Sequence, residues 1–121
     1  MGWWGAIGAT EQLQIYGDSK LKVTDSSVTV ELHVANKGSA SAVIYKVEVG
    51  GKEVSIQDTS AQGLTCSSSS NTCTVAPGGD GTITATGSIS GIVPGASYVV
   101  KVYTKAGNTY QITLVAEVAT G

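Results

Sequence analysis

Apolar and polar residues alternate along most of this sequence, and that pattern limits what the chain can fold into. Between Val28 and Val34 every second residue is apolar, which is typical of a β-strand with one buried face. The same alternation recurs at residues 43–49, 83–89, 98–103 and 110–118. No window carries a sustained run of apolar residues at the helical spacings of three and four. We therefore expect an all-β fold.

Turn signals separate these alternating segments. Gly50-Gly51 is a two-residue hairpin signal before residues 52–56, and residues 105–108 connect the last two strands because Gly and Asn tolerate positive φ. Residues 13–15 and 21–23 supply a first edge strand or strand pair. About seven short strands, each with one face buried, predict an antiparallel two-sheet sandwich.

One face of each expected strand is assigned by this alternation. The residues that share these faces are Val28, Val30, Leu32 and Val34; Val43, Tyr45, Val47 and Val49; Ile83, Ala85, Gly87 and Ile89; Tyr98, Val100 and Val102; and Tyr110, Ile112, Leu114, Ala116 and Val118. The residues between them, including Ile44 and Tyr103, are expected on the opposite faces.

The composition excludes several classes of function. Seven Lys, nine acidic residues and no Arg give a net charge of −2, which leaves no basic surface for nucleic acid. One His, and two Cys without metal-ligand spacing, cannot supply a multi-His metal site, so no metal or cofactor is expected. With 41% hydrophobic and 13% charged residues, the chain is too apolar to be disordered. Its 121 residues suit one domain.

Cys66 and Cys73 flank a Ser-rich tract and are the two cysteines of the chain. An even cysteine count in a Ser-rich chain of low charge fits an oxidising compartment, so we expect a disulfide that closes a hairpin. For so small a loop, chain entropy gives about 2.5 kcal/mol of stabilisation. A redox-active pair would need the closer Cys-x-x-Cys spacing at the start of a helix. Free thiols are the alternative.

The N-terminal segment is apolar and carries Trp3, Trp4 and Ile7. It is too short for a spanning helix, which needs about 20 apolar residues. Tryptophans beside small residues, just before the first charge, are typical of the point where a membrane helix leaves the hydrocarbon layer. We interpret residues 1–10 as the remnant or exit of a hydrophobic N-terminal helix, and residues 11–121 as the sandwich domain. An ordinary terminal segment that packs both indoles on the domain is the alternative.

His33 is the natural candidate for a general base. A catalytic triad, however, needs a nucleophile and an orienting acid that converge on the base in one pocket, and no nucleophile-elbow motif is present. The alternation places His33 on the outward face of its strand, where we expect a solvated surface histidine. No catalytic residue is predicted, and the chain is expected not to be an enzyme.

Four acidic residues fall in expected turns: Asp18, Asp25, Asp58 and Asp80. Turn carboxylates are calcium ligands in many proteins, and Gly78-Gly79-Asp80-Gly81 would offer such ligands. Asp in Gly-rich turns more often hydrogen-bonds nearby backbone, and we favour that interpretation. Asn71-Thr72-Cys73 matches only a rare variant of the glycosylation sequon.

Aromatic residues supply the candidate contacts with other molecules. The outward-facing Tyr103 is a candidate for a subunit contact. For Trp3 and Trp4 the order of preference is a helix exit or interface, then loose packing on the domain, then stacking on a glycan.

Residues 92–102 resemble the turn and following strand of fibronectin type III and related immunoglobulin-like sandwiches. Pro94 presets φ at the second turn position, Gly95 takes positive φ at the third, and the hydroxyl of Tyr98 at the strand start can cap the corner. The resemblance implies an immunoglobulin-like (fibronectin type III-like) sandwich and carries little information about function.

The layout of the whole chain resembles archaeal type IV pilins and the related archaellum filament proteins. It has a Trp-containing apolar end, then residues 8–15 (Gly-Ala-Thr-Glu-Gln-Leu-Gln-Ile), then a Thr-, Val- and Gly-rich sandwich that closes with a Pro-Gly turn and two long strands. The resemblance implies a hydrophobic helix packed in a filament core and an immunoglobulin-like domain that faces outward.

The expected function is that of a structural subunit of an archaeal pilus-like or archaellum-like cell-surface filament, for adhesion or motility. Its partners would be further copies of itself, joined through the missing helix, which would also make the membrane contact. One alternative is a membrane-anchored archaellum accessory or stator protein that binds the surface layer. The other is a carbohydrate-binding or adhesion module of a secreted protein.

Overall fold

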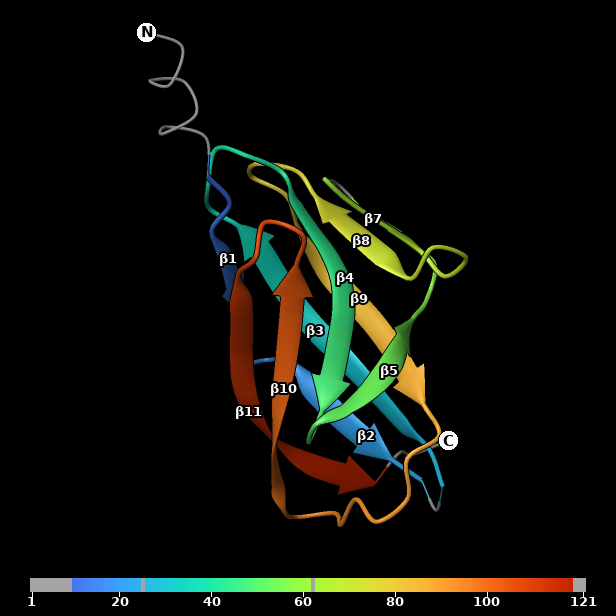
Figure 1. Cartoon of the computed structure of the whole chain (residues 1–121). Coiled ribbons are helices and arrows are strands. Elements are labelled where there is room, and N and C mark those ends of the chain that lie inside the picture. The colour runs from blue at the N-terminus through green and yellow to red at the C-terminus, as the bar shows by residue number, and fades with distance from the viewer. Residues whose placement is uncertain (1–9, 25, 62, 119–121) are drawn as a thin grey trace, which may run out of the picture.

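The computed structural model describes residues 10–24, 26–61 and 63–118. These residues form eleven strands, and no helix lies among them (Figure 1). The strands are β1 (Leu13–Ile15), β2 (Lys20–Val23), β3 (Val28–Asn36), β4 (Ala42–Val49), β5 (Lys52–Ile56), β6 (Thr59–Ala61), β7 (Leu64–Ser67), β8 (Thr72–Val75), β9 (Asp80–Gly87), β10 (Ser97–Thr104) and β11 (Thr109–Val118). The all-β prediction is confirmed. Within the described part of the chain, no helix has the length and hydropathy to cross a membrane.

Seven of the strands close into a ring. Its order is β10-β11-β2-β3-β9-β5-β4, and β4 pairs back with β10. β1 adds to β3, while β8, β7 and β6 extend from β4. The closed ring does not confirm the predicted antiparallel two-sheet sandwich, and one pair, β11 with β2, is parallel.

Two strands change partners along their length, and this closes the ring. β5 pairs with β4 up to Val54 and with β9 from Ser55. β11 pairs with β10 up to Val115 and with β2 from Ala116, and it bends where it makes this change (Figure 1). A strand that bends in this way forms a corner between two faces of a twisted sheet, so the faces share strands rather than lying apart.

The interior is filled by Val, Ile and Leu side chains that face one another across the ring. In β3 the alternation holds, since Val28, Val30, Leu32 and Val34 are all buried. The largest fully buried side chains are Leu21, Leu32, Ile44, Ile56, Leu64 and Ile83. Branched aliphatic side chains suit a pleated surface with one buried face, which is why a chain without Phe builds this core.

β4 contradicts the face assigned to it from the sequence. Ile44 is buried, although it was expected opposite Val47, and Tyr45, expected beside Val47, is 42% exposed. The pairing of β4 with β10 shifts register here: Tyr103 lies opposite Lys46, but Thr104 lies opposite Ile44. The extra residue is a β-bulge, which reverses the alternation for every residue on its far side.

β7 and β8 form the hairpin that carries both cysteines. Cys66 and Cys73 lie opposite each other in the register and are joined by a disulfide with an S–S distance of 1.99 Å. The sequence assigned the short flanking strands to this hairpin, whereas β6 was not expected. β6 is short and polar, and its residues carry no alternation that could have marked it as a strand.

The predicted corner before β10 is closed by a turn and a tyrosine. The Ala96 N–H donates to the Val93 carbonyl at 3.1 Å, with Pro94 and Gly95 between them and Gly95 at φ 93°. The Val93 N–H donates to the Tyr98 hydroxyl at 2.8 Å. These bonds fix the loop that leads from β9 into β10.

Candidate functional site

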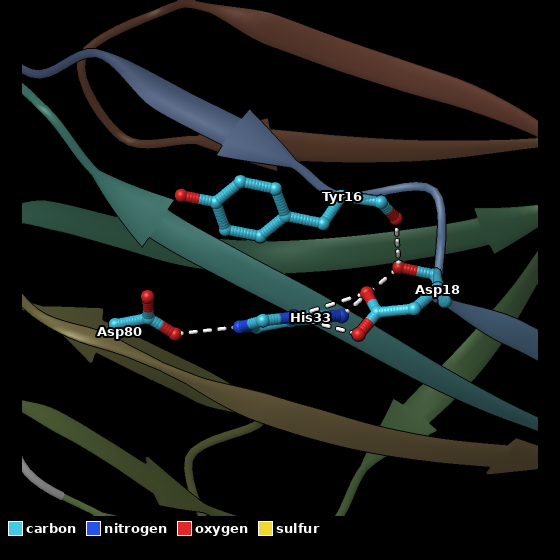
Figure 2. Close-up of polar contacts among 5 residues, drawn as sticks. Tyr16, Asp18, His33 and Asp80 are labelled. Carbon is cyan, nitrogen blue, oxygen red and sulfur yellow. Dashed lines mark hydrogen bonds and ion pairs between the residues drawn. The ribbon is translucent and has the colours of Figure 1, made fainter.

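The outer face of β3 holds a histidine whose two ring nitrogens both bind carboxylates (Figure 2). His33 Nε2 lies 2.6 Å from Asp80 Oδ1, and Nδ1 lies 3.0 and 3.1 Å from the two oxygens of Asp18. The three side chains come from different elements: the turn after β1, the middle of β3 and the start of β9. They form the His33 cluster.

The turn between β1 and β2 positions Asp18 through its neighbours. The buried Ser19 hydroxyl donates to the Tyr16 carbonyl at 2.8 Å and accepts the backbone N–H of His33 at 3.0 Å (Figure 2). The Tyr16 ring packs on the imidazole with 4.5 Å between ring centroids, and Lys37 Nζ lies 6.0 Å from the Tyr16 centroid. The turn is thereby tied to β3 by both backbone and side chain.

Charge decides what this cluster can do. Hydrogen bonds to Asp80 and, with smaller effect, to Asp18 raise the pKa of His33 above its ordinary value, which favours an imidazolium that donates on both sides. Neither ring nitrogen is free to accept a proton from a substrate, and the Ser19 hydroxyl proton is committed to Tyr16. The expectation of a freely solvated histidine is corrected: His33 faces outward but is held in place.

The described acidic residues considered as calcium ligands do not converge on one point. Asp58 accepts the Ser68 N–H at 2.6 Å, and this bond lowers the pKa of Asp58. Asp18 and Asp80 lie on opposite sides of the His33 ring, and Asp25 lies outside the described residues. Across the residues that the structure describes, no three His, Cys, Asp or Glu side chains gather as metal ligands.

An open hollow of about 400 Å³ lies beside Asp80. Its wall is made by Gly63, Pro77, Gly78 and Gly79, so it presents mainly backbone. Asp80 is its one charged lining residue, and one of that carboxylate's oxygens already binds His33. Trp3, Trp4 and Ile7, the predicted interface residues, lie outside the described residues.

A second polar cluster lies on the outer face of β4 and β10. The Tyr103 hydroxyl donates to Glu48 Oε1 at 2.8 Å, and Lys46 Nζ lies 3.2 Å from Glu48 Oε2 and 5.4 Å from the Tyr103 ring centroid. The bond from Tyr103 lowers the pKa of Glu48, and the same bond raises the pKa of Tyr103. Tyr103 thus faces outward, where it was predicted, and its ring is fixed.

Two residues that sequence reasoning missed tie the chain together at one end of the molecule. Asn36 is fully buried; its Oδ1 accepts the N–H groups of Gln12 and Gly38, and its Nδ2 donates to the carbonyls of Ala40 and Val75. Glu11 Oε2 accepts bonds from three side chains of the β10–β11 hairpin: Thr104, Asn108 and Tyr110. For Asn36, the available sequence signal was an Asn at the end of an apolar strand.

Asn71 is also engaged, which bears on the sequon variant. Its Oδ1 accepts the Ile56 N–H at 2.8 Å and its Nδ2 donates to the Tyr45 carbonyl at 3.4 Å. Its φ of 55° is the left-handed conformation that Asn tolerates. Both polar atoms of this amide are thus used inside the protein.

Comparison with known proteins gives a likeness of fold. No family model and no curated protein sequence matches the chain. Among solved structures, the archaellum periplasmic stator protein FlaG from Sulfolobus acidocaldarius superimposes with a TM-score of 0.50 at 18% identity, over 87% of this chain and 100% of that one. The likeness is one of fold, and it spans the whole of that chain.

Two further structures are similar at lower scores. A CARDB domain from Pyrococcus furiosus, solved with di-metal ions, has a TM-score of 0.46 at 11% identity, over 90% of this chain and 96% of that one. A β-glucosidase from Kluyveromyces marxianus has a TM-score of 0.40 at 16% identity, over 88% of this chain and 15% of that one.

Proposed function

We propose that this chain is the extracytoplasmic domain of an archaeal archaellum accessory protein of the stator type, which binds the surface layer and catalyses no reaction. The fold likeness to FlaG, which spans all of that chain, is the observation that carries the proposal. We include in it an immunoglobulin-like assignment of the fold, which the Tyr98 corner supports.

The chemistry of the described surface is consistent with a binding role. The Cys66–Cys73 disulfide supports a location in an oxidising compartment. In the His33 cluster, the imidazole joins β3 to β9 and to the turn after β1. Glu48 and Lys46 fix the Tyr103 ring on an outer face. Surfaces of this kind serve recognition, because their side chains are already ordered before a partner arrives.

The filament-subunit function predicted from the layout has no specific support from the FlaG likeness, which favours the accessory role. The two functions differ in what the chain assembles with. A filament subunit binds copies of itself, whereas an accessory domain of this type binds the surface layer. Assembly behaviour therefore separates them.

The test is sedimentation with cell envelopes of the source organism. The purified chain is mixed with envelopes that retain the surface layer and, as the control, with envelopes stripped of it. We expect the chain to sediment with the first and to stay in the supernatant with the second. A chain that stays soluble with both, or that forms filaments by itself in electron micrographs, contradicts the proposal.

A further inference from the structure

The bulge in β4 turns outward a tyrosine that the strand's alternation would have pointed inward. Tyr45 and Lys46 face outward in succession, and Tyr45 is the one aromatic residue among the exposed large hydrophobic side chains of the described chain. A β-bulge costs ladder pairing and re-aims a side chain, and such bulges are found next to functional sites. The position of Tyr45 therefore calls for a functional explanation.

The structure also compensates for what the bulge disrupts. The register of β4 with β5, Val47 opposite Val54 and Val49 opposite Lys52, would next place Tyr45 opposite Ile56. β5 has left β4 by then, and the Asn71 amide stands between them, accepting from Ile56 N–H and donating to the Tyr45 carbonyl. Asn71 thus substitutes for a ladder contact and fixes the backbone that carries Tyr45.

Tyr103 lies on the same outer face. It is opposite Lys46 in the β4–β10 register, one residue from Tyr45, and its ring is fixed through Glu48 and Lys46. Tyr45 and Tyr103 thus occupy neighbouring positions on adjoining strands of one outer face. Rigid aromatic side chains lose little conformational entropy on binding, which favours their use in recognition.

The charges around the rings cancel. Lys46 and Lys101 are balanced by Glu48 and Glu53, since Lys101 lies opposite Glu48 and Glu48 opposite Glu53 on neighbouring strands. Thr109 and Gln111 lie opposite Tyr103 and Lys101 on β11 and add polar side chains without charge. A neutral ligand with many hydroxyl groups complements this surface better than an anion or a cation does.

We propose that Tyr45 and Tyr103 form a platform for a neutral saccharide of the cell envelope. The C–H faces of a sugar ring pack on phenol rings, and its hydroxyls both accept bonds from lysine and donate to carboxylate. The centre of a protein–protein interface is depleted of charged residues, whereas here the Lys46–Glu48 ion pair directly adjoins the Tyr103 ring. The inference rests on the proposed function, because an envelope partner supplies the saccharide.

Affinity electrophoresis of the whole chain through gels that contain dextran, mannan or heparin tests this site. We expect retardation by at least one of the two neutral polysaccharides and none by heparin. The variants Tyr45→Ala and Tyr103→Ala are each expected to bind at least tenfold more weakly, while Tyr45→Phe keeps its ring and binds. Val93→Ala is the control: it shortens an exposed apolar side chain before β10, and its binding is expected to be unchanged.

A variant that leaves both rings in place tests the role of Asn71 as a positioning residue. Asn71→Asp keeps the acceptor for Ile56 N–H and loses the donor to Tyr45, so binding is expected to weaken severalfold while the melting transition stays cooperative. The saccharide site is overturned by retardation with heparin alone, by retardation with no polysaccharide, or by retardation of Tyr45→Ala and Tyr103→Ala that equals that of the wild type. If envelopes still sediment Tyr45→Ala as well as the wild type, the site fails but the proposed function stands.

Discussion

His33 couples the folding of the domain to pH through its two carboxylate partners. Asp80 and Asp18 raise the pKa of His33 in the folded state. The two ion pairs therefore stabilise the fold fully at pH values below the pKa of the unfolded state, which is near 6.5. This stabilisation is lost as the pH rises through the raised pKa of His33 in the folded state. Solvent screens ion pairs that are partly exposed, so we expect the two pairs together to contribute about 1 kcal/mol to the free energy of unfolding.

The prediction for His33→Gln follows from that sign. Urea unfolding is expected to show a loss of about 1 kcal/mol at pH 5.5 and a smaller loss at pH 9. Asp18→Asn and Asp80→Asn, measured as controls, each remove part of this pH dependence. A loss that is equal at both pH values, or larger at pH 9, would show that the imidazolium is not what the cluster stabilises.

Asn36 is expected to be among the most sensitive polar residues of the chain. Asn36→Ala leaves two N–H groups and two carbonyls without the partner that they have inside the protein. A cost of about 3 kcal/mol in unfolding free energy is expected, because buried unpaired groups are expensive. Asn108→Ala, which removes one exposed bond to Glu11, is the matched control at less than about 1 kcal/mol.

At the scale of elements, the disulfide hairpin closes a loop of seven residues' separation. The double variant Cys66→Ala/Cys73→Ala is expected to lose about 2.5 kcal/mol in unfolding free energy, which chain entropy gives for so small a loop. The loss is measured by urea unfolding against the oxidised wild type. An unchanged midpoint would mean that the covalent bond adds nothing to the strand pairing around it.

The loop between β8 and β9 crosses Gly63 with no space between the backbones. A Cβ on Gly79 would overlap the Gly63 carbonyl oxygen, whereas a Cβ on Gly78 meets no atom within 4 Å and suffers only from φ +78°. Gly79→Ala is therefore expected to cost about 2–3 kcal/mol and Gly78→Ala about 1 kcal/mol by thermal or urea unfolding. Equal costs for these neighbours would contradict the close crossing.

Across the whole molecule, the sequence predicted what depends on local patterns. Alternation assigned the buried face of β3, and turn chemistry located the Gly50-Gly51 hairpin and the Pro94-Gly95 corner, where all three glycines have positive φ. The bulge at Tyr45 was not predictable, because one inserted residue is invisible without knowing which strand pairs with β4. The partner changes of β5 and β11 are hidden for the same reason.

The candidate sites show the same division. His33 was correctly placed on an outward face, but its partners lie 15 and 47 residues away in sequence, and only the pairing of β3 with β9 and the turn after β1 bring them together. Asn36 and Asn71 bond mainly to backbone groups, and those groups leave no mark on side-chain patterns. Charge, in contrast, is a property of composition and could be used from the start.

The proposed accessory function, which is binding to the surface layer, places the chain in the cell envelope and not in surface filaments. Quantitative mass spectrometry of sheared surface filaments and of cell envelopes, both prepared from the source organism, tests it most directly. We expect peptides of this chain in the envelope fraction and none in the filaments. Recovery of the chain as a major component of the filaments would contradict it.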